Sequence, residues 1–346
     1  MLLSFIFIAS FLVSIAFTWL YRLIALRANF LDLPVSRSAH SRPVPVGGGV
    51  VIFSLFLFAV CFLFANDKLS MGQFMAFSAS LLVAVVGFVD DIKELKIQWR
   101  IFPQLFASIW AVWWLGGISE VNFYAFTVSQ QWLLNFLGVV AIVWLVNLYN
   151  FMDGIDGLAA SELVFVNVMS LIFVTNSTGS AFSILSLVSL GAALGFLVWN
   201  WSPAKIFMGD VGSGFIGFML GVIAIISVQQ QAMTVWTWLI LLGVFVVDAT
   251  LTLFRRFAAG EKWYQGHACH AYQKAAKHFN SHQKVTITIM LINTFWLAPL
   301  AWLSVLYPKL GIAFAVAAIV PLIFIAISLA AGKEAKAGPN SEYVVE

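Results

Sequence analysis

The sequence predicts an all-α, polytopic integral membrane protein with about eleven transmembrane helices, and three observations support this fold class. The chain of 346 residues is 62% hydrophobic and only 10% charged, and its mean hydropathy is +0.97. Apolar runs long enough to cross a bilayer recur along the chain, and most lysines and arginines lie between alternate pairs of runs. A soluble protein of this length would expose far more charge, which excludes that class.

The candidate spans define the expected topology. The first begins at Leu2 with no basic residue ahead of it, and Arg22 and Arg27 follow it, which is the reverse of a cleavable signal peptide. We therefore expect a retained helix with its N-terminus outside. The spans are expected at roughly 2–21, 46–65, 71–89, 101–118, 132–149, 158–175, 181–199, 213–230, 234–254, 286–307 and 310–331.

The distribution of basic residues supports this arrangement. When the spans alternate from an outside N-terminus, only Lys68 and Lys309 of the 18 lysines and arginines fall outside, and the C-terminus is cytoplasmic. An excess of basic residues on the inner side is what the positive-inside rule demands. We expect one transmembrane catalytic domain at 1–331 and a polar cytoplasmic tail at 332–346.

The stretch NLYNFMDGIDGL is the most informative polar segment. It directly follows an apolar run and places Asn147, Asn150, Asp153 and Asp156 three residues apart. Neighbouring members can face each other on a helix, but three-residue steps carry the whole set around the axis by roughly 180° over nine residues. Carboxylates at the end of a span are costly and usually mark a site. A simple polar turn between two spans would need fewer such groups.

Two further acidic motifs fall on the same, cytoplasmic side. Asp90 and Asp91 end the third span, where paired carboxylates can hold a divalent cation, carry a proton or simply face solvent. Asp210 lies in FMGDVGSG, where glycines and a helix start offer backbone N–H groups to phosphate. Acids and amides on one membrane face indicate a hard cation, Mg²⁺ or Mn²⁺, with oxygen ligands beside a phosphate.

Basic and aromatic candidates accompany these acids. The loop at 32–49 carries Arg37 and His40 before three glycines, and Lys205 precedes Asp210. Phe207 is interpreted either as ordinary packing or as a ring that stacks on a nucleobase beside the phosphate motif.

The largest cytoplasmic loop contains a histidine motif. His267 and His270 can face each other across one helical turn, but no second pair of ligands completes a zinc site. Arg255 and Arg256 lie nearby, which favours contact with an anionic diphosphate. Asp248 is interpreted either as the partner of these arginines or as part of the site.

The same loop ends in a basic segment. His278 and His282 lie among lysines there, and we expect them on a basic interfacial face near anionic lipid.

In this order the motifs resemble those of the polyprenyl-phosphate N-acetylhexosamine-1-phosphate transferases (glycosyltransferase family 4 type), nearest the branch that initiates O-antigen synthesis. The resemblance runs from about Asp32 to Gln273 and rests on DD, NxxNxxDGxDGL, NWSPAKIFMGDVGS and RR…HxxH. It implies transfer of an N-acetylated hexosamine or 6-deoxyhexosamine 1-phosphate from a UDP-sugar to undecaprenyl phosphate, which releases UMP and initiates cell-envelope polysaccharide synthesis. It also implies Mg²⁺, with Mn²⁺ as a substitute, and an active site on the cytoplasmic face of a bacterial inner membrane.

The resemblance also assigns roles to residues of this chain. Asp90 and Asp91 resemble the catalytic pair, with Asp90 the candidate for deprotonating the lipid phosphate, and Asn150 and Asp210 resemble the metal ligands. The histidine motif departs from the family pattern, because Cys269 occupies its middle position. The residues expected to bind substrate are Arg37, His40, Asn147, Asp153, Asp156, Asn200, Lys205, Phe207, His267 and His270.

Two alternatives remain open at this stage. One is the phospho-N-acetylmuramoyl-pentapeptide translocase of peptidoglycan synthesis, which shares these motifs. The other is a lipid or solute transporter, although such proteins place charge at the bilayer midplane and often show repeated halves. The expected partners are undecaprenyl phosphate, a UDP-sugar and membrane lipid, with no nucleic acid, and a homodimer is compatible with the sequence.

Overall fold

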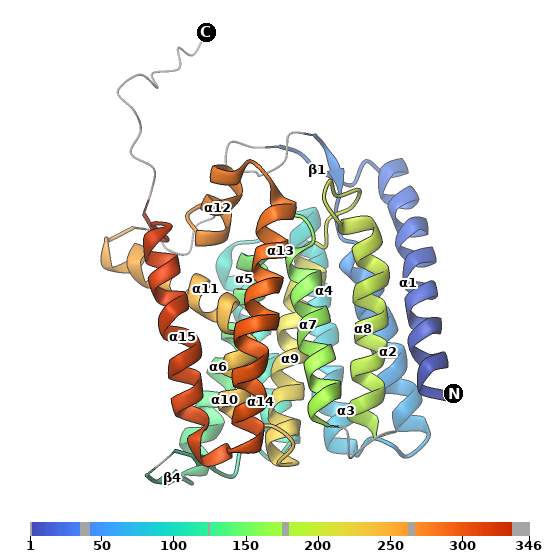
Figure 1. Cartoon of the computed structure of the whole chain (residues 1–346). Helices are drawn as coiled ribbons and strands as arrows, with labels where there is room; N and C mark the ends of the chain where they lie inside the picture. The colour runs from blue at the N-terminus through green and yellow to red at the C-terminus, as the bar shows by residue number, and fades with distance from the viewer. Residues whose placement is uncertain (1, 35–41, 124, 175–179, 262–266, 334–346) are drawn as a thin grey trace.

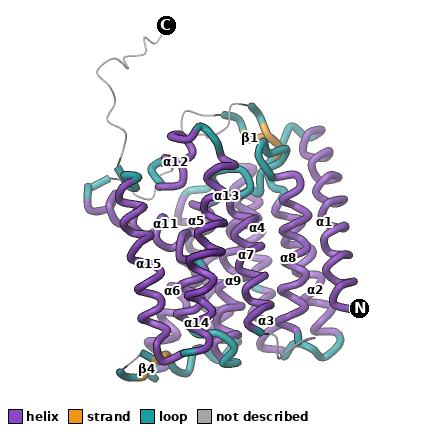
Figure 2. Tube along the Cα trace, in the orientation of Figure 1, coloured by secondary structure: helices purple, strands orange, loops and turns teal. Residues whose placement is uncertain are grey.

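The computed structural model describes residues 2–34, 42–123, 125–174, 180–261 and 267–333. It is a bundle of helices that run in roughly one direction, with short hairpins at opposite ends (Figure 1). Helices account for nearly all of the regular structure (Figure 2). The roles expected for Arg37 and His40, and for the tail beyond Lys333, lie outside the described residues.

The described part of the N-terminal half contains six helices and two hairpins. In chain order these elements are α1 (Leu2–Arg27), β1 (Leu31–Asp32), β2 (Val44–Pro45), α2 (Gly49–Ala65), α3 (Met71–Ser78), α4 (Ser80–Ile92), α5 (Ile97–Trp114), β3 (Val121–Asn122), β4 (Thr127–Val128) and α6 (Gln131–Met152).

In the described part of the C-terminal half, all of the regular elements are helices. Its elements are α7 (Leu158–Phe173), α8 (Ala181–Asn200), α9 (Asp210–Gln229), α10 (Val235–Leu241), α11 (Gly243–Ala258), α12 (Ala271–Phe279), α13 (His282–Ile292), the π-helix η2 (Asn293–Leu297), α14 (Ala298–Leu306), the 3₁₀ turn η3 (Pro308–Leu310) and α15 (Gly311–Ser328).

This architecture confirms the all-α, polytopic membrane class. Each expected apolar segment coincides with a helix or with consecutive helices of the described chain. Seven of these are long and apolar enough to cross a membrane, and α10 with α11 forms an eighth candidate that bends by 80°. Helices α2 and α7 are apolar but shorter. The total of eleven spans and the outside N-terminus stay predictions.

Helix α9 forms the centre of the bundle. Within the protein, 89% of the most apolar stretch of α9 is buried, whereas only 17% of that of α1, at the edge of the bundle, is buried. It packs against α4, α6 and α2, whereas α1 packs mainly against α8. The N-terminal end of α9 carries Asp210, so the fold places this motif where several helices end together.

Two glycines bring α4 close to the start of α9. A Cβ at Gly87 would collide with the backbone of Asp210 and Val211. Gly209, at the N-cap of α9, has φ +77°, and a Cβ there would lie 2.6 Å from a carboxylate oxygen of Asp91. Because both positions exclude larger side chains, the acidic end of α4 lies directly beside the start of α9.

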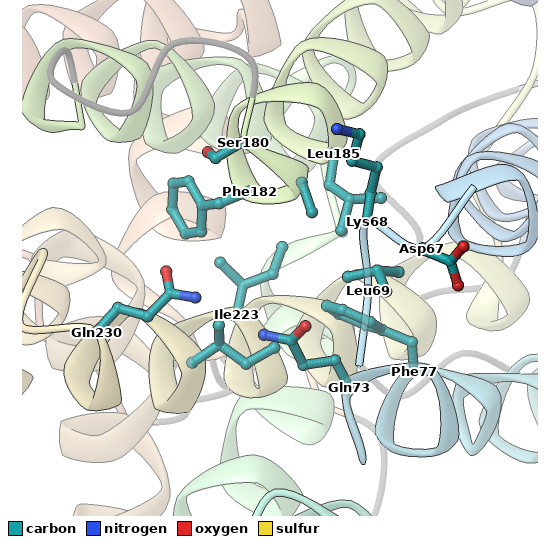
Figure 3. A pocket seen from close by; sticks show the side chains of 12 residues that line it. Asp67, Lys68, Leu69, Gln73, Phe77, Ser180, Phe182, Leu185, Ile223 and Gln230 are labelled. Carbon is teal, nitrogen blue, oxygen red and sulfur yellow. The ribbon is translucent and has the colours of Figure 1, made fainter. Parts of the chain in front are cut away.

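Cavities occur at both ends of α9. The smaller one, of about 340 Å³, lies at its C-terminal end and contains none of the expected site residues. Apolar side chains such as Phe182 and Ile223 surround it, and the polar Gln73 and Gln230 lie at its border (Figure 3). The larger cavity lies at the N-terminal end, beside Asp210.

Candidate active site

A cavity of about 1240 Å³ gathers most of the residues that the sequence singled out. The ends of α4, α6 and α9 form its polar wall, and α5, α6 and α11 contribute an apolar part. Its lining includes Asp90, Asp91, Asn147, Asn150, Asp153, Asp156, Asn200, Phe207, Asp210 and His267.

Asp91 holds the first turn of α9. Its Oδ1 accepts a hydrogen bond from the backbone N–H of Asp210 at 2.7 Å, and its Oδ2 accepts one from Val211 at 3.2 Å. A helix N-terminus has unpaired N–H groups and a partial positive charge, so a carboxylate stabilises it. The geometry therefore gives Asp91 a positioning role, while its expected catalytic role stays a prediction.

Arg100 of α5 joins the acidic groups and was missed as a site residue by the sequence analysis. Its Nε lies 2.9 Å from Asp90 Oδ2, and its Nη2 lies 3.5 Å from Asp210 Oδ2. The same Nη2 donates to Asn150 Oδ1 at 3.2 Å. A guanidinium among anionic groups is the arrangement that also binds phosphate. The signal available in the sequence was a basic residue one short turn into an apolar helix.

The two expected metal ligands are in direct contact. Asn150 Nδ2 donates to Asp210 Oδ1 at 2.5 Å and to Ser213 Oγ at 3.2 Å. Helix α6 supplies Asn150 and α9 supplies Asp210, so the pair depends on the close packing of these two helices.

Asp210 and Asn150 offer oxygen ligands of the kind that a hard divalent cation such as Mg²⁺ takes. Among the residues that the structure describes, no group of three or more His, Cys, Asp or Glu side chains could hold a metal ion. Mg²⁺ does not require such a group, because it commonly binds one or two carboxylates together with substrate phosphates and water. Asp210 supplies a carboxylate of that kind, and Asn150 supplies an amide oxygen, which in this structure accepts from Arg100 Nη2 while the amide nitrogen faces Asp210. Asp90 Oδ2 lies 2.9 Å from Nε of the same Arg100 guanidinium.

Asp153 and Asp156 differ in environment although they share one motif. Burial, followed by repulsion from Asp210, Asp91 and Asp156, raises the pKa of Asp153 well above its usual range. Burial also acts to raise the pKa of Asp156, but hydrogen bonds from His282 and the Ala204 N–H outweigh it and lower that pKa. Of the two carboxylates in this motif, Asp153 is therefore the one whose burial and charge repulsion a bound cation or proton would offset most.

Asp156 and Asn200 connect structural elements as well as lining the cavity. Asp156 Oδ1 lies 3.3 Å from His282 Nδ1, and its Oδ2 accepts from the Ala204 N–H at 3.1 Å. Asn200 Oδ1 accepts from the Gly157 N–H at 3.0 Å. These contacts fix the turn between α6 and α7. His282 therefore lies in the cavity wall rather than on the basic face near anionic lipid that we expected for it.

Two expected substrate contacts lie outside the cavity lining. Lys205 is exposed, and its Nζ lies 5.3 Å from the centroid of the Trp199 ring. Its backbone oxygen accepts from Arg22 at 3.1 Å. His270 is 1% exposed and lies behind His267, at 5.0 Å between ring centroids. The structure thus brings His267, but not Lys205, to the polar wall.

The remaining expected contacts line the cavity from different elements. Asn147 donates to Gln104 Oε1 and to the Val143 carbonyl, both at 2.8 Å. Phe207 lines the cavity, and its N–H donates to the Pro45 carbonyl at 2.8 Å. Its predicted nucleobase contact is compatible with this place.

The site as a whole combines an amphiphilic shape with ionic groups. Carboxylates, amides and one guanidinium lie at the helix ends, and Leu105, Val140 and Trp144 continue the lining between α5 and α6. Such a cavity can receive a molecule with an anionic head and an apolar tail, and it can hold a second anion through a cation. These features are compatible with a membrane-embedded transferase of phosphorylated substrates.

Comparison with known proteins specifies this class. The model of glycosyl transferase family 4 matches residues 73–228, which include α4 to α9 and the acidic motifs. The chain belongs to the polyprenyl-phosphate N-acetylhexosamine-1-phosphate transferases of this family. The family prediction made from the motifs is thereby confirmed.

Curated relatives come from several branches. A probable undecaprenyl-phosphate N-acetylglucosaminyl 1-phosphate transferase of Bacillus subtilis is 28% identical over 295 residues, which cover 83% of this chain and 81% of the relative. A phospho-N-acetylmuramoyl-pentapeptide-transferase of Streptococcus sanguinis is 33% identical over 228 residues, 61% of this chain and 66% of the relative. A decaprenyl-phosphate N-acetylglucosaminephosphotransferase of Mycolicibacterium smegmatis is 26% identical over 309 residues, 78% and 74% respectively.

Proposed function

We propose that this enzyme transfers an N-acetylated hexosamine or 6-deoxyhexosamine 1-phosphate from a UDP-sugar to undecaprenyl phosphate, in the first step of O-antigen-type polysaccharide synthesis. The observation that carries the proposal is the meeting of Asp90, Asn150 and Asp210 at Arg100, beside a cavity with an apolar extension. An anionic lipid and an anionic nucleotide sugar both find suitable groups there. The similarity to the Bacillus subtilis relative, a probable undecaprenyl-phosphate N-acetylglucosaminyl 1-phosphate transferase, covers more of both chains than the similarity to the Streptococcus sanguinis relative, which supports an N-acetylglucosamine-type donor over the muramoyl-pentapeptide.

The proposed reaction is a displacement at phosphorus. An oxygen of the lipid phosphate attacks the β-phosphorus of the UDP-sugar, and the bond from that phosphorus to the bridging oxygen breaks. UMP leaves with that oxygen, and the product is a lipid diphosphate that carries the sugar. Because attacking and leaving groups are both anionic, the protein must chiefly position them and offset their charge.

Arg100 and Asp90 act on the acceptor side in this proposal. The Arg100 guanidinium offers further N–H groups to the lipid phosphate, since it has five donors in a planar fork. Asp90 Oδ2 lies 2.9 Å from Arg100 Nε, so the carboxylate orients that guanidinium. From this place Asp90 also accepts the proton of an acceptor phosphate that arrives as the monoanion.

Asp210 and Asn150 would hold Mg²⁺. When bound, the ion offsets repulsion between the two substrates and stabilises the charge on departing UMP. Asp91 keeps Asp210 at the helix end through the two backbone hydrogen bonds. Phe207 and Asp153 line the part of the cavity assigned to the nucleotide.

A substrate panel tests the proposal. Purified enzyme with undecaprenyl phosphate and Mg²⁺ is given UDP-N-acetylglucosamine, UDP-N-acetyl-6-deoxyhexosamines or UDP-N-acetylmuramoyl-pentapeptide, and UMP release is measured. We expect release with a donor of the first two groups and none with the pentapeptide. Release with the pentapeptide alone would assign the chain to peptidoglycan synthesis, and no release with any donor would contradict transferase activity on UDP-sugars.

The cytoplasmic position of the site is tested by accessibility. In a background of Cys61→Ala and Cys269→Ser, single cysteines are introduced at Lys277 and Glu120. The topology expected from the basic residues places Lys277 inside and Glu120 outside. A membrane-impermeant maleimide should label only the second position in intact cells, and both after lysis. Labelling of Lys277→Cys in intact cells would place the site on the opposite face.

A further inference from the structure

Asp248, inside α11, is a buried carboxylate that the proposed reaction does not use directly. It is 4% exposed and accepts hydrogen bonds from the backbone N–H groups of Ala271 at 2.8 Å and Tyr272 at 2.9 Å. Its Oδ1 also lies 3.2 Å from His270 Nδ1 and 3.2 Å from Thr252 Oγ1. A buried carboxylate with several donors is held in one orientation, so Asp248 fixes the first turn of α12 and one ring nitrogen of His270.

The contact between Asp248 and His270 Nδ1 determines which ring nitrogen of His270 can meet another group. A carboxylate only accepts hydrogen bonds, so the neutral imidazole beside it carries its proton on Nδ1. The opposite nitrogen, Nε2, is buried without a hydrogen-bond partner among the residues that the structure describes. A buried polar nitrogen of this kind is costly unless a ligand or water meets it.

His270 belongs to a stack of rings that reaches the cavity. Its ring lies 5.0 Å from that of His267 with an interplanar angle of 26°, and 6.0 Å from that of Phe151 with 27°. His267 lines the cavity, and neither of its ring nitrogens has a partner within the described part of the chain. The stack therefore continues from Asp248 through His270 to an imidazole at the cavity wall.

A second connection runs from the same carboxylate to the metal-binding segment. Asp248 holds the N–H of Tyr272, and the Tyr272 hydroxyl donates to the Phe151 carbonyl at 2.8 Å. Gly154 packs against that hydroxyl so closely that a Cβ would collide with it. Because Phe151 follows Asn150 directly, α12 is fixed against the end of α6 as well as against α11.

We propose that Asp248 is a positioning residue for donor binding, which sets His270 and through it places the His267 imidazole against the diphosphate of the nucleotide sugar. The inference rests on the proposed function, since it needs an anionic donor in the cavity. It also answers the question that the sequence left open about Asp248, because its carboxylate organises the histidine motif. Asp248 and His270 act through His267 and do not touch the reacting atoms.

The test is a double-mutant cycle with steady-state kinetics for both substrates. Asp248→Asn removes the charge beside His270 Nδ1, and His270→Asn keeps a donor near Asp248 but lacks the rest of the ring. We expect each to raise the KM for the UDP-sugar by roughly 10- to 100-fold, the loss from one charge-assisted hydrogen bond. The KM for undecaprenyl phosphate should stay within about twofold. The KM of the double variant for the UDP-sugar should rise no further than that of the more impaired single variant, because both changes interrupt one connection.

Thr252→Val provides the matched control. It removes another hydrogen bond to the same carboxylate but leaves His270 and α12 in place, so its kinetics should match those of the unmodified enzyme. Full additivity in the Asp248→Asn and His270→Asn cycle, or an equal rise in both KM values, would overturn the positioning role. That result is distinct from failure of the proposed function, in which the unmodified enzyme releases no UMP from any UDP-sugar.

A second cycle covers the case in which Asp248→Asn does not fold. His270→Asn is then combined with His267→Gln. If His270 acts through His267, the rise in KM for the UDP-sugar caused by His270→Asn should disappear in the His267→Gln background. An undiminished effect in that background would contradict the proposal.

Discussion

The carboxylate of Asp91 accepts hydrogen bonds from the backbone N–H groups of Asp210 and Val211, so the end of α4 caps the helix that carries the proposed metal ligand. Asp91 and Asp210 are 119 residues apart in sequence. The contact links two acidic motifs that the sequence shows only as separate signals. It also separates the adjacent residues Asp90 and Asp91, because Asp90 pairs with Arg100 instead.

Asp91 should therefore act through the position of Asp210. Asp91→Ala removes the N-terminal cap of α9, which typically costs about 0.5 to 2 kcal/mol of stability. We expect a lower melting temperature and a higher Mg²⁺ concentration for half-maximal activity, whereas Asp91→Asn, which keeps an acceptor oxygen, should lose less of both. Thermal unfolding in detergent and metal titration of activity measure the two effects. An Asp91→Ala enzyme with unchanged stability and metal dependence would contradict the capping role.

Asp90 should contribute to the chemical step. Asp90→Asn is expected to lower kcat by a factor on the order of 10² to 10⁴, the usual contribution of general-base catalysis. The dissociation constant for the UDP-sugar should change little, because the nucleotide contacts are assigned to other segments. Since the second pKa of a phosphate is about 6, the lipid phosphate is largely dianionic at neutral pH, and a general base then contributes less to the rate. If kcat of Asp90→Asn stays near normal from about pH 6 to about pH 9, the base assignment is wrong.

Metal removal should abolish activity. The oxygen-rich pair of Asn150 and Asp210 suits a hard divalent cation, so EDTA should stop UMP release, and Mg²⁺ or Mn²⁺ should restore it. Asp210→Asn removes one negative charge from the proposed ligand set and should raise the Mg²⁺ concentration needed for half-maximal activity. Asn167→Leu, a buried change in α7 away from the cavity lining, serves as the control. Full activity in excess chelator is the outcome that would refute the proposal.

Glu162 and Asn293 should stabilise the bundle interior as a pair. Both are 0% exposed, and Asn293 Nδ2 donates to Glu162 Oε2 at 2.6 Å, between α7 and the π-helix η2. Asn293→Leu leaves the carboxyl group without this donor, which should cost about 1 to 3 kcal/mol and lower the melting temperature.

Apolar replacement of both partners provides the comparison. The double variant Glu162→Leu, Asn293→Leu should recover most of the lost stability, because no buried polar group then stays unpaired. Thermal unfolding of the two variants measures this. Equal or greater destabilisation in the double variant would show that the pair has another role.

His267 should make stability depend on pH. Burial, then the neighbouring His270 and Arg256, lowers the pKa of His267 from 6.5 to about 3. In the unfolded chain the imidazole gains a proton below 6.5, whereas in the folded protein it stays neutral until about 3. The stability of the folded protein is therefore unaffected by protonation of His267 above pH 6.5, and it decreases as the pH falls from 6.5 to about 3.

A variant without the imidazole should respond less to acid. The melting temperature of the unmodified enzyme should fall more between pH 7 and pH 5, about two units around the normal histidine value, than that of His267→Gln. His278→Gln is the matched control, since His278 is an exposed residue of α12. Identical pH dependence of all three proteins would disprove the assignment.

The sequence alone determined the fold class and the order of the helices, and it singled out most of the polar residues that line the larger cavity. These features are local, since a bilayer requires continuous apolar helices, and polar residues at their ends stand out against that background. The segments at 71–89 and 213–230, for example, coincide with α3–α4 and α9. The family resemblance likewise depended on short motifs at such ends, and the comparisons confirmed it.

Only the tertiary structure decided how those ends meet. Arg100 was one of many basic residues that the sequence led us to expect on the cytoplasmic side. Packing of α5 against α4 and α6 places it between Asp90, Asp210 and Asn150. The sequence left Asp248 open as a partner of nearby arginines or as part of the site, and the position of α12 brings its carboxylate to His270. Hydropathy fixes where each helix ends along the membrane normal, whereas the neighbours of each end depend on side-chain packing between distant segments.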